Sequence, residues 1–193
     1  MACRIIFFLV LSFPAFSQPL VDDIRRSLRN AIQKGQPDTI SYHLALLSSQ
    51  FIEAQHYDSA RFYLRKAIVF NTSYGNMPRL AENYNNLGVC HYYSGETDST
   101  IYFYDAAYKT YHNLRDTGMM SVLNINLGML YQQKGDYENG LKRLLEASRY
   151  FEKSEPSSNL AICYNSIGNL YLDIGEAELA ITFHYRALDE WRD

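Results

Sequence analysis

The sequence has few cysteines, which excludes a small domain held together mainly by disulfides. It contains three cysteines in 193 residues, and one of them, Cys3, lies close to the N-terminus. A disulfide scaffold needs more than the remaining Cys90 and Cys163. The hydrophobic share of 47% is that of a folded chain, so the fold must rest on side-chain packing.

An excess of charge of one sign is also lacking. Eighteen basic and 21 acidic residues give a net charge of −3, and the pI is near 5.9. This balance offers no electrostatic reason to expect nucleic acid or an anionic membrane as a partner.

No hydrophobic run near the N-terminus is long enough to span a bilayer, which needs about 20 apolar residues. The run from Ile5 to Phe13 follows Arg4 and precedes a small-x-small pattern that ends at Ser17. This pattern predicts a signal peptide over residues 1–17, removed on export to the periplasm or the medium. A buried helix or a membrane anchor is the alternative interpretation. We expect no stable membrane span in this chain.

Catalytic and metal-binding motifs are missing as well. The sequence has no Gly-rich phosphate loop, no Gly-x-Ser-x-Gly, no His-Glu-x-x-His and no Cys-x-x-Cys. His91 and His184 occupy aromatic packing positions, and neither has a second ligand three or four residues away. We therefore predict no enzyme, no metal site and no cofactor, and expect Cys90 and Cys163 to be buried, inert thiols.

What the sequence does contain is a repeat of 40 residues. Three segments in the same register read Asn86-Leu87-Gly88, Asn126-Leu127-Gly128 and Ser166-Ile167-Gly168, and alanines recur at 67, 107, 147 and 187. Each unit shows helical periodicity twice, with a turn between the two helices. The array is predicted over residues 39–193, in units 39–78, 79–118, 119–158 and 159–193.

The glycines of the repeat have two predicted purposes. Gly88, Gly128 and Gly168 stand in the middle of a first helix, where the lack of a side chain lets the second helix approach. Gly135 and Asp136 mark the turn, because glycine accepts the left-handed conformation after a helix and aspartate caps the next helix.

Residues 18–38 are predicted to contain an N-terminal capping helix. Ile24, Leu28 and Ile32 recur every four residues, and Gly35 ends the pattern. The sequence shows no equivalent cap after the second helix of the fourth unit. This favours self-association through the C-terminal hairpin, or a chain that is the N-terminal part of a longer protein.

The pattern Asn-Leu-Gly, Tyr131, Gly135-Asp136-Tyr137 and Ala147 resembles the tetratricopeptide repeat. The resemblance implies an all-α fold, a right-handed α-solenoid of four helical hairpins plus the capping helix. The period exceeds the usual value of about 34 residues. In this it is similar to the N-terminal sensory arrays of bacterial membrane-bound histidine kinases and related transcription regulators.

The resemblance also implies a peptide-binding groove on the concave face, lined by the first helix of each hairpin. Carried over position by position, the candidate contacts are Asn85, Asn86, Tyr92, Tyr93, Asn126, Gln132, Gln133, Asn165, Asn169 and Asp173. Amides both donate and accept, so they can pair with the backbone of an extended peptide, and tyrosines add apolar area. A solvated helix face without a ligand is the alternative, in which Asn86 and Asn126 only brace a neighbouring helix.

These observations predict a non-catalytic scaffold that binds a protein or an extended peptide through its concave face. The alternative is the N-terminal sensor fragment of a signal-transduction protein, either a histidine kinase or a transcription regulator. An enzyme is the third and least favoured hypothesis.

Overall fold

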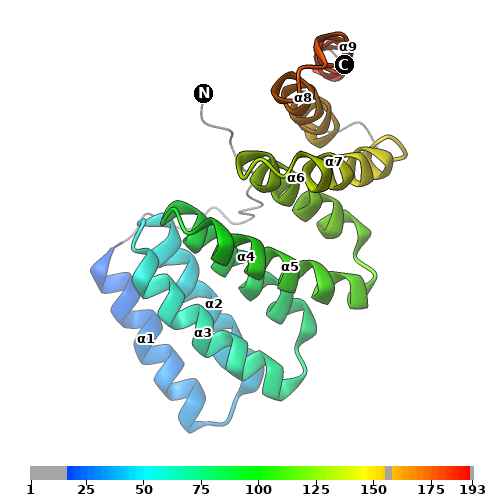
Figure 1. Cartoon of the computed structure of the whole chain (residues 1–193). Coiled ribbons are helices and arrows are strands. Elements are labelled where there is room, and N and C mark those ends of the chain that lie inside the picture. The colour runs from blue at the N-terminus through cyan, green and yellow to red at the C-terminus, as the bar shows by residue number, and fades with distance from the viewer. Residues whose placement is uncertain (1–16, 155–157, 192–193) are drawn as a thin grey trace. The chain divides into compact units, whose positions relative to one another are not determined.

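The computed structural model describes residues 17–154 and 158–191, and over these residues the chain is helical. In chain order the helices are α1 (Gln18–Gln33), α2 (Pro37–Glu53), α3 (Tyr57–Tyr74), α4 (Met77–Tyr93), α5 (Thr97–Leu114), α6 (Thr117–Gln133), α7 (Tyr137–Phe151), α8 (Ser158–Asp173) and α9 (Ala177–Glu190) (Figure 1). The apolar run of the predicted signal peptide lies outside the described residues. Within them, no helix is long and apolar enough to cross a membrane.

The helices keep the 40-residue register of the sequence, which confirms the predicted all-α fold of helical hairpins. The second helices begin at Tyr57, Thr97, Tyr137 and Ala177. The first helices begin at Pro37, Met77, Thr117 and Ser158, one or two residues before the predicted starts of the units.

Local chemistry explains these starts and the turns. The Asn76 and Asp116 side chains accept hydrogen bonds from backbone N–H groups in the first turns of α4 and α6. The predicted cap Asp136 does the same for α7, after Gly135 with a φ of 76°. In the first hairpin, Gln55 adopts this left-handed conformation without being glycine.

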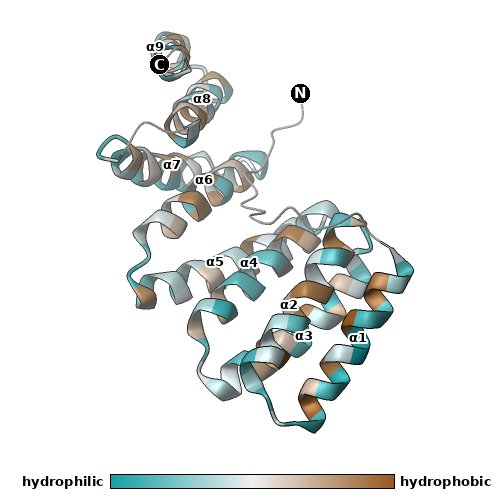
Figure 2. Ribbon diagram, turned by 180° about the vertical axis from the view of Figure 1, so that it is seen from behind, coloured by the Kyte–Doolittle hydropathy of each residue, from teal (hydrophilic) through white to brown (hydrophobic). Residues whose placement is uncertain are grey.

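The described helices fall into two compact units, one holding α1 to α5 and the other α6 to α9. In the first unit each helix packs on the next along the chain, and α2 also contacts α4. In the second unit the same sequential packing holds from α6 to α9, and α6 also contacts α8. Apolar residues alternate with polar ones around most of these helices, as Figure 2 shows.

The mid-helix glycines lie where the second helix of each hairpin comes closest, as the sequence predicts. A Cβ added to Gly88 would lie 2.4 Å from Tyr104 Cδ1, and one added to Gly128 would lie 2.6 Å from Leu144 Cγ. At Gly168 the nearest atom would be His184 Cε1, at 2.8 Å. Each glycine therefore makes room for one side chain of the paired helix.

Helix α1 packs on α2 and buries Val21, Ile24, Leu28 and Ala31. Ile32, which follows Ile24 and Leu28 at the same four-residue spacing, does not continue this buried stripe, because its side chain is 56% exposed. Eight residues turn a helix roughly 80° past two full turns, so the step from Ile24 to Ile32 leaves the face that Ala31 still occupies.

A charged network in the first unit ties α3 to the turn between α4 and α5. Arg61 Nη1 donates to Glu96 Oε1 at 2.9 Å, and Arg61 also pairs with Asp58. His91 Nδ1 lies 2.8 Å from Glu96 Oε2, and its ring stacks on Phe103 with centroids 5.0 Å apart. The hydrogen bond from His91, with the charge of Arg61, holds the pKa of the Glu96 carboxyl below its ordinary value. His91 is thus a buried seam residue, as expected.

Candidate peptide-binding surface

In the first unit the candidate residues all lie on α4. Asn85 and Asn86 are half-buried, and neither side chain makes a hydrogen bond with another residue in the described part of the chain. These two amides therefore keep their donors and acceptors for a ligand. The bracing role that the sequence left open for Asn86 has no hydrogen bond to support it.

The aromatic part of this surface is held in place by Tyr57, a residue outside the predicted set. The Tyr93 side chain is 50% exposed, and its ring stacks on Tyr57 of α3 with centroids 5.2 Å apart and an angle of 12° between the planes. Burial raises the pKa of the Tyr57 hydroxyl, and the neighbouring Tyr93 makes a smaller contribution in the same direction. The stack fixes the orientation of the Tyr93 ring beside the half-buried Tyr92. Tyr57 sits at the start of a second helix, outside the positions carried over from the resembled repeat.

In the second unit the candidates lie on the neighbouring helices α6 and α8. Gln132 Nε2 of α6 donates to Asp173 Oδ2 of α8 at 2.6 Å, so these two predicted residues meet. Asn165 Oδ1 lies 3.2 Å from His184 Nδ1. Gln133 and Asn169 make no side-chain hydrogen bond with any other described residue, and Gln133 is exposed while Asn169 is half-buried.

Asn126 is the exception, and its prediction as a ligand contact is corrected here. Its side chain is 1% exposed, because it stands within Ser121–Leu130, a stretch of α6 whose residues are all buried. A helical stretch that is buried around its whole circumference is packed on all sides. An extended peptide cannot reach this amide as it is placed.

Cationic side chains are scarce on the four first helices. Helices α2, α6 and α8 contain no Lys or Arg. Helix α4 contains Arg79, whose Nη1 pairs with Glu82 Oε2 at 2.8 Å. Partial burial raises the pKa of Glu53, the last residue of α2. The surface is therefore neutral to acidic and presents amides and aromatic rings.

The structure offers no reactive thiol on this surface. Cys90 and Cys163 are both free and fully buried, as expected. Burial raises the pKa of Cys90 to about 12 and also raises that of Cys163, so neither thiol ionises near neutral pH. Among the described residues, no group of three His, Cys, Asp or Glu side chains gathers as a metal site would require.

Paired helices in a fixed register define a helical-repeat scaffold of the kind that binds proteins. The tetratricopeptide repeat family model matches residues 118–190, which span α6 to α9. Residues 118–190 therefore match tetratricopeptide repeats, and the hairpins of α2 to α5 share the same fold.

Known proteins share this architecture. Over 110 residues the chain is 24% identical to the transcriptional activator NprA of Geobacillus stearothermophilus, a match that covers 57% of this chain and 27% of the activator. The crystal structure of BtubC from P. vanneervenii has a TM-score of 0.77 at 19% identity and covers 90% of this chain and 77% of that one. A signal transduction ATPase with a tetratricopeptide repeat sensor, from Pyrococcus horikoshii, has a TM-score of 0.76 at 14% identity, covering 89% of this chain and 27% of its own. The structural likenesses show the fold.

Proposed function

We propose that the protein is a non-catalytic scaffold whose units each bind an extended segment of a partner protein on their first helices. The observation that carries this proposal is the set of accessible amides without a hydrogen bond to other described residues: Asn85 and Asn86 on α4, Gln133 on α6 and Asn169 on α8. Each such amide can donate to a backbone carbonyl and accept from a backbone N–H of the bound segment.

The same surface sets the chemistry of the partner. Because the first helices have almost no cations, a buried carboxylate on the ligand would lack a positive partner. The carboxylates of Glu53 and Asp173 instead favour a neutral or basic segment. The stacked rings of Tyr93 and Tyr57 would contact its apolar side chains.

Removing one amide from each of three helices is expected to weaken binding strongly. The variant combines Asn85→Ala, Gln133→Ala and Asn169→Ala, and the probes are extended peptides selected from a displayed library on residues 18–193. The two hydrogen bonds lost in the α6–α9 unit, at about 0.5–1.5 kcal/mol each, correspond to a loss of affinity of at least about fivefold for a segment bound there. Fluorescence polarisation with labelled peptides measures it.

A matched control removes three exposed amides from the helices outside this surface: Asn30 and Gln33 of α1 and Asn113 of α5. Changed together to alanine, they should leave the affinity as it is. The proposal is wrong if the surface variant binds as tightly as the wild type, or if the control variant loses as much.

A second candidate function is that of an exported sensory array in a signal-transduction protein. It is favoured by the sequence match to a transcriptional activator and by the fold shared with an ATPase whose repeats are described as a sensor. The gene sequence beyond codon 193 tests this. An apolar span of about 20 residues followed by a kinase or helix-turn-helix pattern supports the sensor, and a stop codon directly after Asp193 contradicts it.

A further inference from the structure

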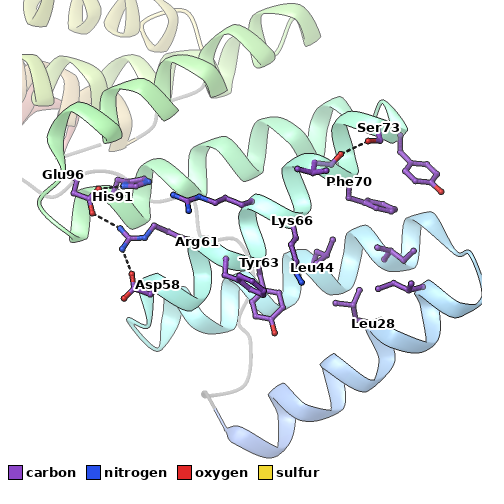
Figure 3. A pocket seen from close by; sticks show the side chains of 16 residues that line it. Leu28, Leu44, Asp58, Arg61, Tyr63, Lys66, Phe70, Ser73, His91 and Glu96 are labelled. Carbon is purple, nitrogen blue, oxygen red and sulfur yellow. Dashed lines mark hydrogen bonds and ion pairs between the residues drawn. The ribbon is translucent and has the colours of Figure 1, made fainter.

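The first unit has a recess between α1 and α3 that shares no residue with the candidate peptide-binding surface. Figure 3 shows its side chains: Leu28 comes from α1, Leu44 from α2, and Tyr63, Lys66 and Phe70 from α3. The recess has a volume of about 1110 Å³. Its far end lies at the network of Arg61 with Asp58 and Glu96. We call it the outer groove.

The outer groove carries apolar side chains that are left in contact with solvent. Val69 is 69% exposed, Tyr74 is 59% exposed and Phe62 is 53% exposed, all on α3, and Ile32 of α1 faces the same recess. A group of large apolar side chains exposed around one recess marks an interaction site more often than scattered single residues do.

The other repeats show that the hairpin fold does not require these apolar residues. The positions 40, 80 and 120 residues after Val69 hold Lys109, Arg149 and Asp189. A charged side chain is therefore compatible with this position of the hairpin. The positions that follow Phe62 in the same way hold Tyr102, Lys142 and Thr182. At the position of Val69 an apolar side chain is therefore found in the first repeat alone, whereas at the position of Phe62 the second repeat keeps an exposed aromatic ring.

The two helices that flank the outer groove are positively charged, although the whole chain carries −3. Helix α1 has three arginines against two aspartates, and α3 has Arg61, Arg65 and Lys66 against Asp58, which gives +3 for the pair. Arg61 is already occupied by Asp58 and Glu96. Arg65 makes no ion pair within the described part of the chain, and Lys66 Nζ lies 4.3 Å from the centre of the Phe62 ring. These two cations are available to an acidic partner.

The walls of the groove also limit the backbone of its occupant. Every residue that lines the groove lies in a helix, except Glu96. The backbone N–H and C=O groups of these helices are bonded within the helices and therefore cannot pair with a strand. An occupant desolvated here must satisfy its own backbone, as a helix does. From Asp58 to Tyr74 the lining of α3 spans roughly 24 Å at 1.5 Å per residue, the length of a four-turn helix.

We propose that the outer groove binds an acidic amphipathic helix of a partner protein. Its apolar residues, spaced i, i+3/i+4 and i+7, pack on Val69, Phe70 and Ile32. Its carboxylates lie along the edge formed by Arg65 and Lys66. This contact is independent of the amides on α4, α6 and α8.

The test uses residues 18–193 and two labelled helical peptides of 16 residues with the same leucine stripe. One peptide has glutamate and the other lysine at the positions that flank the stripe. The glutamate peptide should bind at least tenfold more tightly than the lysine peptide at low salt. Val69→Lys, which installs the residue of the second repeat, should weaken the glutamate peptide at least tenfold. The double variant R65E/K66E should reverse the preference between the peptides.

Tyr102→Lys is the matched control, because Tyr102 is 68% exposed on α5 and does not line the groove. It should leave binding unchanged, as should the triple amide variant, and circular dichroism should show the wild-type fold for Val69→Lys. Equal binding of both peptides, or an equal loss in Tyr102→Lys, overturns the proposal. It is also overturned if neither peptide binds while the protein forms oligomers that Val69→Lys dissociates, because the occupant is then a second copy.

Discussion

Replacing Gly88 with alanine is expected to lower the free energy of unfolding of the α1–α5 unit by about 2–3 kcal/mol. The new Cβ would lie 2.4 Å from Cδ1 and 2.5 Å from Cε1 of Tyr104, and this ring is fully buried, so it has no free space to turn into. Overpacking of this severity costs about 3 kcal/mol or more. The better helix propensity of alanine returns about 1 kcal/mol. Urea denaturation followed by circular dichroism measures the change.

A second substitution at the facing position should relieve this strain. The first repeat holds Ser48 and Leu64 in the register of Gly88 and Tyr104, and both are buried. A residue with a Cβ is therefore compatible with leucine opposite it. The double variant G88A/Y104L should be less destabilised than the sum of the single variants by at least 1 kcal/mol, on the order of coupling between touching residues.

Gly168→Ala is the comparison within the same chain. Its Cβ would meet His184 at 2.8 Å, but this ring is only half-buried and can swing toward solvent. We expect it to cost less than half as much as Gly88→Ala. If Gly88→Ala, Gly128→Ala and Gly168→Ala all leave the stability unchanged, close helix approach is not the reason for glycine at these positions.

The hairpin fold could be predicted from the sequence because each of its signals is local or exactly repeated along the chain. Gly135 with Asp136 marks a turn by backbone conformation and capping chemistry, and both are found as expected. The close contact of Gly88 with the second helix could also be predicted, because a small residue in the middle of each first helix implies a close neighbour there. The neighbour is Tyr104.

The accessibility of the site could not be predicted from register alone. Asn86 and Asn126 occupy the same repeat position, yet Asn86 is half-buried and Asn126 is 1% exposed. The difference comes from the rest of each helix: where α4 has Asn85, α6 has the fully buried Ile125. Gln50 shows the same effect, because it is fully buried at the position that holds Leu130 and Leu170 in later repeats. Tertiary packing decides these cases.

The outer groove was missed for another reason. The resemblance to the repeat family places ligands on the first helices, and the exposed side of a second helix lies outside those positions. The signal was nevertheless present in the register, where Val69 stands among Lys109, Arg149 and Asp189. An exposed apolar residue at a position that is charged in the three remaining repeats indicates a binding surface, because folding does not require an apolar residue there.

A large loss of stability in the α6–α9 unit is expected for Leu144→Ala, at about 3 kcal/mol or more. Leu144 is fully buried, and its Cγ would lie 2.6 Å from a Cβ on Gly128. Gly128→Ala alone should cost about 1–2 kcal/mol, since it overpacks this contact. In the double variant the new methyl group enters the space that Leu144 leaves. The double variant should therefore be no less stable than Leu144→Ala, with a coupling of at least about 1 kcal/mol between the sites.

The contact between the helix backbones limits how complete this compensation can be. The Cβ on Gly128 would also lie 3.1 Å from the backbone oxygen of Gly140, which no side-chain change removes, so α6 and α7 must separate by a few tenths of an ångström. The control pairs Gly128→Ala with Leu130→Ala: Leu130 is as buried but lies two residues further along α6, roughly 200° around the helix. Those two changes should add within about 0.5 kcal/mol. Additive losses for Gly128 and Leu144, measured in the same urea titrations, would show that the glycine is not there to admit the leucine.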